Sequence, residues 1–132
     1  MATNKLEKNF ADLDLLFSPN PITKDVSLKY DVEAVKRSVR HLLFTNRGER
    51  LFQPENYCGI RNLLFENYGS VQMVSLRNKI EEVISNYEPR INGLVVDFHP
   101  APDSNYLQID IKFTVQNSPT VSNMTFDIQR AR

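Results

Sequence analysis

Carboxylates in the C-terminal half of the chain are the side chains that could carry out hydrolysis. Glu88 could pair with Asp97 or Asp110 as the acid and base of a glycosidase, a reaction that needs two carboxyl groups about 5–9 Å apart. Asp97 and Asp110 occupy the polar positions of alternating segments, where acidic side chains are usually exposed to solvent. A lysozyme-like glycosidase of cell walls is therefore the less favoured alternative, and the sequence predicts no catalytic residue here.

One thiol and two imidazoles offer a second kind of chemistry. Cys58 beside His41 or His99 would imitate the thiol–imidazole pair of a cysteine hydrolase. Cys58, however, lies in a turn-rich segment without a recognisable motif, and both histidines occupy positions typical of a protein surface. These three side chains are too few and too widely spaced for a zinc site, and the sequence has no glycine-rich phosphate loop. We therefore expect neither an enzyme nor a metal or other cofactor.

Charged side chains at two turns suggest protein contacts instead of catalysis. Pro89 alone suffices to end a helix, because it disfavours the helical conformation at the preceding residue, so its neighbours Glu88 and Arg90 need another explanation. If the pair is exposed, it contributes about 0–1 kcal/mol. If it is desolvated in an assembly, the loss of one partner costs about 3–5 kcal/mol. A second charged group consists of Arg47, Gly48, Glu49 and Arg50.

Two long helices are predicted from apolar side chains that recur at three- and four-residue steps. The first covers about residues 32–43, with Asp31 as its N-cap. The second begins after a cap at Ser70 and ends at about Tyr87, ahead of the proline. A short helix is expected between them, at about residues 61–67.

The remaining elements are predicted to be strands. A hairpin is expected near residues 44–52, because the turn formers at its centre lie between apolar residues. From residue 94 onward, apolar and polar residues alternate in three segments separated by turn formers, which predicts an antiparallel meander. The apolar positions of the last segment are Met124, Phe126 and Ile128. Because one face of this sheet is apolar, helices must cover it, and the predicted fold class is α+β.

The chain of 132 residues is predicted to form an N-terminal arm over residues 1–29 and a single α+β domain over residues 30–132. Pro19 and Pro21 favour an extended arm. The apolar residues around Leu15 are too many for a solvated tail. They are expected to pack against the domain or, slightly favoured, against a neighbouring protein.

The charge balance narrows the range of partners. Sixteen basic and sixteen acidic residues give a formal net charge of zero, which argues against a nucleic-acid partner and against an anionic membrane surface. No apolar run approaches the roughly 20 residues of a membrane helix, and the N-terminus lacks the apolar core of a signal peptide. A single cysteine suits a reducing compartment. We therefore expect a soluble protein made in a cytosol.

Three short motifs occur in a fixed order ahead of the paired strands: TNRGERLFQPE, NLLFEN and NYEPRI. Together they resemble the baseplate wedge proteins of contractile-tailed bacteriophages, the small sheath-initiator family with counterparts in type VI secretion baseplates. The resemblance runs from about residue 29 to residue 128. One departure is Gly59, which follows Pro54-Glu55 later than in the family pattern. Asn56 tolerates the left-handed conformation and is the candidate for that role.

The resemblance implies a structural protein that is not an enzyme. It implies that the helical bundle of the wedge core is contacted by Glu88, Pro89 and Arg90. The charged turn would be a second partner-binding site, with Arg47, Gly48, Glu49 and Arg50. The tail sheath protein would dock by strand addition on the strand that carries Met124, Phe126 and Ile128. The protein would then lie in the tail baseplate of the virion, assembled in the host cytoplasm. A baseplate of a related injection or secretion system is the alternative.

Overall fold

Two helices and two antiparallel sheets make up the described structure, so the predicted α+β class is confirmed. The computed structural model describes residues 10–61, 69–101 and 106–129. Within these residues the elements follow in the order β1 (Ala11–Leu13), β2 (Leu28–Tyr30), α1 (Asp31–Phe44), α2 (Ser70–Tyr87), β3 (Ile91–Ala101), β4 (Tyr106–Val115) and β5 (Val121–Gln129). Neither of the helices described here is long and apolar enough to cross a membrane.

The three C-terminal strands form the predicted meander. Strand β4 lies between β3 and β5, and both pairings are antiparallel. In register, Ile111 of β4 lies between Val96 of β3 and Met124 of β5. Every second residue of β4 is buried from Leu107 to Val115, and the residues between them are not. This two-residue period is the one expected of a strand with one face in the core.

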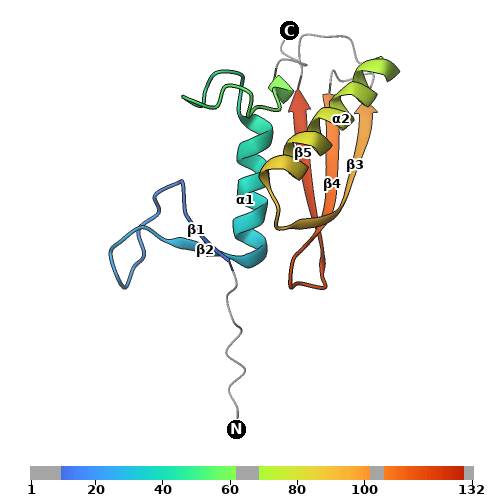
Figure 1. Ribbon diagram of the computed structural model, residues 1–132. Helices are drawn as coiled ribbons and strands as arrows, with labels where there is room; N and C mark the ends of the chain where they lie inside the picture. Colours follow the sequence, from blue (N-terminus) through green and yellow to red (C-terminus); the bar gives the residue numbers. More distant parts are fainter. Residues whose placement is uncertain (1–9, 62–68, 102–105, 130–132) are drawn as a thin grey trace.

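Both helices supply the other half of the core. Figure 1 shows α2 crossing in front of the sheet and α1 running beside it. Val39 and Leu43 of α1, together with Ile80 and Ile84 of α2, are completely buried in one cluster with the inner residues of the sheet. Residues four apart lie on one face of a helix. The two predicted apolar stripes therefore face the core as expected.

The second helix ends at the predicted residue. Tyr87 is its last residue, and Glu88 still donates its backbone N–H to the carbonyl oxygen of Ile84 at 2.9 Å. At the other end the N-cap is Gly69, and no side chain accepts a capping hydrogen bond. The prediction of Ser70 as the cap is wrong, because Ser70 is already the first helical residue.

The prediction of a hairpin near residues 44–52 is wrong. Phe44 is the last residue of α1, and its ring packs edge-on against the ring of Phe126, with 5.6 Å between the centroids. This contact extends the apolar stripe of the helix to the residue that was expected to begin a strand. Leu51 and Phe52, expected in the second strand, are 82% and 99% exposed.

A loop of turns over residues 45–61 stands in place of that hairpin. The left-handed role predicted for Asn56 is wrong: its φ is not positive, and Gly59, with a φ of 68°, adopts that conformation. The buried side chain of Asn56 donates instead to Oε1 of Gln53 at 2.8 Å. Apart from its first residue, the short helix predicted at residues 61–67 lies outside the described residues.

Residues 10–30 form the second sheet, which we call the N-terminal hairpin. Strands β1 and β2 pair antiparallel, and Figure 1 shows them beside the N-terminal half of α1. Asp31 fixes the base of this hairpin: its N–H donates to Phe10 O at 2.9 Å, and its carboxylate accepts the N–H of Phe10 at 3.1 Å. The predicted N-cap is therefore wrong by one residue, since Tyr30 takes that position. The domain boundary between residues 29 and 30 stays a prediction.

Candidate functional site

The turn between α2 and β3 presents the two charges that flank Pro89. Glu88 directly follows the helix, and it is 2% exposed. Arg90 donates from Nε and Nη2 to the two carboxylate oxygens of Glu88, at 2.6 and 2.8 Å. Two parallel charge-assisted hydrogen bonds are the strongest arrangement between an arginine and a carboxylate. The pair therefore holds the turn in one geometry.

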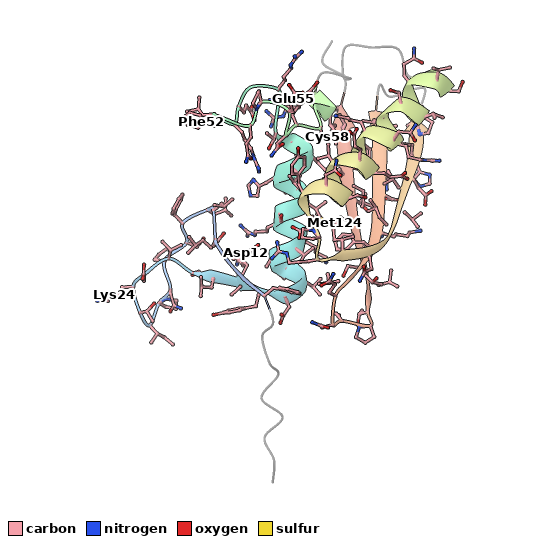
Figure 2. The ribbon with its side chains drawn as sticks, in the orientation of Figure 1. Asp12, Lys24, Phe52, Glu55, Cys58 and Met124 are labelled. Carbon is pink, nitrogen blue, oxygen red and sulfur yellow. The ribbon has the colours of Figure 1, made fainter. Side chains whose placement is uncertain are left out.

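The same arginine also contacts the N-terminal hairpin. Nη1 and Nη2 of Arg90 donate to the two carboxylate oxygens of Asp12, each at 3.1 Å. The guanidinium carbon lies 5.5 Å from the centre of the Phe10 ring. Figure 2 shows Asp12 where the hairpin approaches α1. We call Phe10, Asp12, Glu88 and Arg90 the Arg90 joint, because they connect segments 78 residues apart.

The charges of Glu88 and Arg90 are both stabilised by their surroundings. Burial raises the pKa of Glu88, but hydrogen bonds from Arg90 and Ser38 lower it more, and the resulting pKa is below its usual value. The hydrogen bond to Glu88 raises the pKa of Arg90. Glu88 is therefore ionised at neutral pH, where the acid of a glycosidase must carry a proton.

The backbone of the turn is fixed from the end of β4. Gln116 donates its backbone N–H to Arg90 O at 2.8 Å and its side-chain Nε2–H to Pro89 O at 2.9 Å. Pro89 is exposed, beside a hollow of about 300 Å³ whose lining includes Ser85 and Ile91. The turn is thus a rigid, solvent-facing feature whose two charges point into the molecule.

A second carboxylate attaches the N-terminal hairpin to α1. Asp14 is 1% exposed, and its Oδ1 accepts hydrogen bonds from Arg37 and from the N–H of Leu16. Its Oδ2 lies 3.8 Å from Nζ of Lys29. Burial raises the pKa of Asp14, but the Leu16 amide, the Ser18 side chain and the two cations lower it more, so the carboxyl is ionised.

The outer face of the N-terminal hairpin is apolar. Leu13 and its cross-strand partner Leu28 are 61% and 43% exposed, whereas the adjacent cross-strand pair of Asp12 and Lys29 is partly buried. Further along the hairpin, exposed apolar side chains belong to Leu15, Leu16, Phe17 and Ile22. Exposed apolar patches on a folded protein mark interaction sites.

The predicted charged turn lies in the loop after α1. Gly48 has a φ of 78°, a backbone conformation that glycine adopts without steric cost. Glu49 closes the turn by accepting the backbone N–H and the side-chain amide of Asn46 at 2.9 and 2.7 Å, and these hydrogen bonds lower its pKa. Arg47 and Arg50 are exposed. Arg50 also lines a groove beside the N-terminal hairpin.

The predicted docking strand, β5, is an outer strand of its sheet. It pairs with β4 on one side, and in the described part of the chain no strand pairs with the other side. Phe126 and Ile128 are buried, and Met124 packs against the same core. Since these side chains serve the core, the feature that β5 can offer a partner is the hydrogen-bonding edge of its backbone.

Residues 29–120 match the family model described as baseplate wedge protein gp25. The chain belongs to this family. It is 35% identical over 96 residues to the baseplate wedge protein gp25 of Enterobacteria phage T4, and the match covers 73% of each chain. The resemblance to baseplate wedge proteins expected from the three motifs is confirmed.

Two solved structures are similar to this member of the gp25 family. One is described as a "putative tail lysozyme" from Geobacter sulfurreducens; it is 29% identical, with a TM-score of 0.64 over 74% of this chain and 89% of that chain. The other is a chain of the anti-feeding prophage baseplate, 23% identical, with a TM-score of 0.58 over 93% of this chain and 87% of that chain. The second likeness shows a shared fold.

The gp25-family fold seen here does not assemble the carboxylate pair of a glycosidase. Glu88 faces α1, where Ser38 donates a hydrogen bond to it. Asp97 and Asp110 are partners in register on the opposite, polar face of the sheet, alternating with its buried residues. The sheet therefore separates Glu88 from both aspartates.

The thiol–imidazole pair is not assembled either. Cys58 is buried, and burial raises its pKa to about 12, so that the reactive thiolate is absent at neutral pH. His41 is exposed on α1, and Nε2 of His99 lies 3.2 Å from Oδ2 of Asp110 on the polar face of the sheet. Among the described residues, no cluster of side chains could hold a metal ion.

Sequence reasoning missed the two aspartates that attach the N-terminal hairpin of this gp25-family protein. The signal was present in the segment ADLDL, where acidic and apolar residues alternate with the period of a strand. Such a pattern usually indicates that the apolar set is buried. Here Asp14 is buried and Leu13 is exposed, because cations of α1 and of the Arg90 joint lie on the inner side.

Proposed function

We propose that the protein is a structural component of the baseplate wedge of a contractile phage tail, where it anchors to the wedge core and starts assembly of the tail sheath. The match of residues 29–120 to the baseplate wedge family carries this proposal, because it spans both long helices and the Glu88–Arg90 turn. The protein would lie in the tail baseplate of the virion and enter it in the host cytoplasm.

The anchor is the turn at Pro89, together with the hollow beside it. Glu88 is buried and Arg90 is occupied by two carboxylates, so these two charges stabilise the shape of the turn. The exposed surface is contributed by Pro89, by Ser85 of α2 and by the start of β3. A rigid turn beside a hollow binds a partner at little entropic cost, because no loop has to be ordered on binding.

The sheath contact is the outer edge of β5, which pairs with no other strand among the described residues. A strand of the sheath protein would add to this edge through backbone hydrogen bonds, which is the usual mode of strand addition. The side chains of Met124, Phe126 and Ile128 contribute by holding β5 on the core. This division explains why the strand needs no particular exposed side-chain motif.

A binding assay with purified wedge proteins tests the anchor. Replacing Ser85 with tryptophan would fill the hollow and leave the four residues of the Arg90 joint unsubstituted. Ser75→Trp is the matched control, since both serines are exposed on α2 and only Ser85 lines the hollow. We expect Ser85→Trp to abolish binding and Ser75→Trp to bind like the wild type. Equal binding by both variants would move the anchor away from this turn.

Amide hydrogen exchange in the presence of the sheath protein tests the docking strand. Strand β3 is the other outer strand of the same sheet and serves as the internal control. Added protection in β5 with no change in β3 is the expected result. Protection in β3 alone would assign the sheath contact to the opposite edge, and protection in neither would remove strand addition as its mode.

A further inference from the structure

The N-terminal hairpin carries its charges on the inner side and its apolar side chains on the outer side. Asp12 and Asp14 each bind an arginine of the domain, Arg90 and Arg37. Leu13, one residue from each aspartate, is exposed. A strand that folds only onto its own domain shows the reverse order, with apolar side chains inside. The hairpin is thus fixed in position by ion pairs while its apolar face stays uncovered.

A groove lies where the N-terminal hairpin meets α1 and the loop that follows it. Its volume is about 440 Å³, and its lining includes Leu13 and Leu15 of the N-terminal hairpin, Arg37 and His41 of α1, and Arg50 of the following loop. Asp12 also lines it, and its carboxylate is paired with Arg90. A second hollow of about 420 Å³ continues along α1 and adds Leu16, Lys36, Arg40 and Met124. We call the two together the hairpin groove.

The charge of the hairpin groove is positive and only partly neutralised. Arg37 is paired with Asp14, and Lys36 lies 3.7 Å from a carboxylate oxygen of Glu33. Within the described residues, neither Arg40 nor Arg50 has a carboxylate partner; Arg40 lies over the ring of Phe44. Because the whole chain has no net charge, this excess is a local feature of the groove.

We propose that the hairpin groove is a docking site for an acidic amphipathic segment of another wedge protein, whose apolar side chains cover Leu13, Leu15 and Leu16 while its carboxylates pair with Arg40 and Arg50. The inference rests on the proposed function, since it seeks the partner in the wedge. Charge complementarity of this kind steers and orients a partner. The apolar wall supplies the area removed from water. A nucleic acid would leave the leucine wall uncovered.

The Arg90 joint is a positioning device for this docking site. Arg90 fixes Asp12, which is adjacent to Leu13 in β1. Loss of the joint removes one of the two arginine attachments of this wall, because Asp14 still binds Arg37, while the other wall, α1, stays in the core. Substitutions at Glu88 or Arg90 therefore weaken docking indirectly, even though neither side chain lines the groove.

Photo-crosslinking in the full-length chain tests the occupant. A photoreactive residue replaces Leu16, and a second protein carries it at Val121, which is also exposed but lies outside the groove. Each is irradiated with purified wedge proteins, and the linked peptide is sequenced. Position 16 should link to a segment in which carboxylates neighbour apolar residues, and position 121 should not. Links from position 16 to a segment without carboxylates, or to nucleic acid, would overturn the proposal.

Charge reversal supplies the second test, with wedge binding measured at two salt concentrations. Arg50→Glu should weaken binding at least about tenfold, because like charges would then face each other. Lys24→Glu makes the same change of charge at an exposed site outside the groove, labelled in Figure 2, and should change binding by less than about twofold. Equal effects of the two variants would show a general charge effect and remove the groove as the site.

The two proposals fail in distinguishable ways. If the wild-type chain does not bind wedge proteins, the proposed function fails and the groove loses its partner. If the wild type binds, but position 16 does not link and Arg50→Glu binds normally, the function stands and the groove inference is wrong. We expect each variant to keep the fold, because the substituted positions are exposed. Thermal unfolding of each variant checks this expectation.

Discussion

The three-stranded sheet and the N-terminal hairpin orient their apolar and polar side chains in opposite ways. The sheet turns its apolar side chains toward α1 and α2 and its polar side chains toward solvent. The hairpin turns Asp12 and Asp14 inward and leaves Leu13 and Leu16 exposed. Both consist of antiparallel strands with alternating side chains, so the difference lies only in which set of side chains faces the core.

Because of this difference, the two regions are stabilised by different interactions. Burial of apolar area stabilises the sheet regardless of pH and with little dependence on salt. The hairpin depends on ion pairs and hydrogen bonds. These contribute less free energy where they are exposed to water, and their contribution changes with pH. A region that is held in place by charges keeps its apolar face available for a partner. The comparison therefore predicts where substitutions affect folding and where they affect assembly.

The largest expected effect is in the sheet. Phe113→Ala should lower the free energy of unfolding by about 3–5 kcal/mol, because its ring is completely enclosed and its removal leaves a cavity. Lys112→Ala, one residue away on the polar face, should cost at most about 1 kcal/mol. Chemical denaturation measures both. Equal losses would mean that the two faces of β4 do not differ in the way described.

The next largest effect is at the Arg90 joint. Glu88→Ala should cost about 3 kcal/mol, the lower end of the range for breaking a buried pair, because Arg90 keeps Asp12 as a partner. The control is Glu82→Ala, which removes an exposed pair with Lys79 on the same helix and should cost about 0–1 kcal/mol. If denaturation cannot tell the two variants apart, the joint contributes no more than a surface ion pair.

Acid should loosen the hairpin before the sheet. The pKa values of Asp14 and Glu88 are lower in the folded protein than their usual values. Groups with lowered pKa contribute stability that is complete above the unfolded value of about 4 and is lost as pH falls through the folded pKa. The amide resonances of Leu13 should therefore shift on acidification ahead of those of Ile111. Asp14→Asn should weaken this pH dependence, and simultaneous shifts in the wild type would contradict the distinction.

The smallest effect is expected on the outer face of the hairpin. Leu16 is 72% exposed, so Leu16→Ser should change the free energy of unfolding by less than about 0.5 kcal/mol. The same substitution at the buried Leu43 is the contrasting control. A loss well above this value at Leu16 would mean that the outer face is covered in solution, which sedimentation analysis would detect as self-association.

Periodicity was sufficient to predict the elements that build the core. The stripes of α1 and α2 and the alternation in β4 depend on local spacing, and each was expected within a few residues of where it lies. Pro89 also fixed the end of α2 correctly. Local patterns succeed in these segments because each one agrees with the packing of the whole fold.

The failures come from contacts between distant residues. The turn formers at Asn46 do form a turn, but the predicted strand at Phe44 is helical because Phe126, far along the chain, packs against its ring. Glu88 and Arg90 were identified as a pair that needed explanation, yet the partner that explains them is Asp12. No spacing rule connects that residue to the turn. Whether the turn contacts a wedge protein stays a prediction.

The 78-residue separation within the Arg90 joint has a consequence for biosynthesis. A ribosome releases Asp12 long before it releases Arg90, and domains fold as their residues emerge. Asp14 can bind Arg37 of α1 earlier, whereas the pair of Asp12 and Arg90 can form only after α2 and the turn have been synthesised. A chain that stalls before that point lacks this second ion-pair attachment of the hairpin. The hairpin that carries the exposed leucines is therefore fully attached only in a chain that has been completed beyond Arg90.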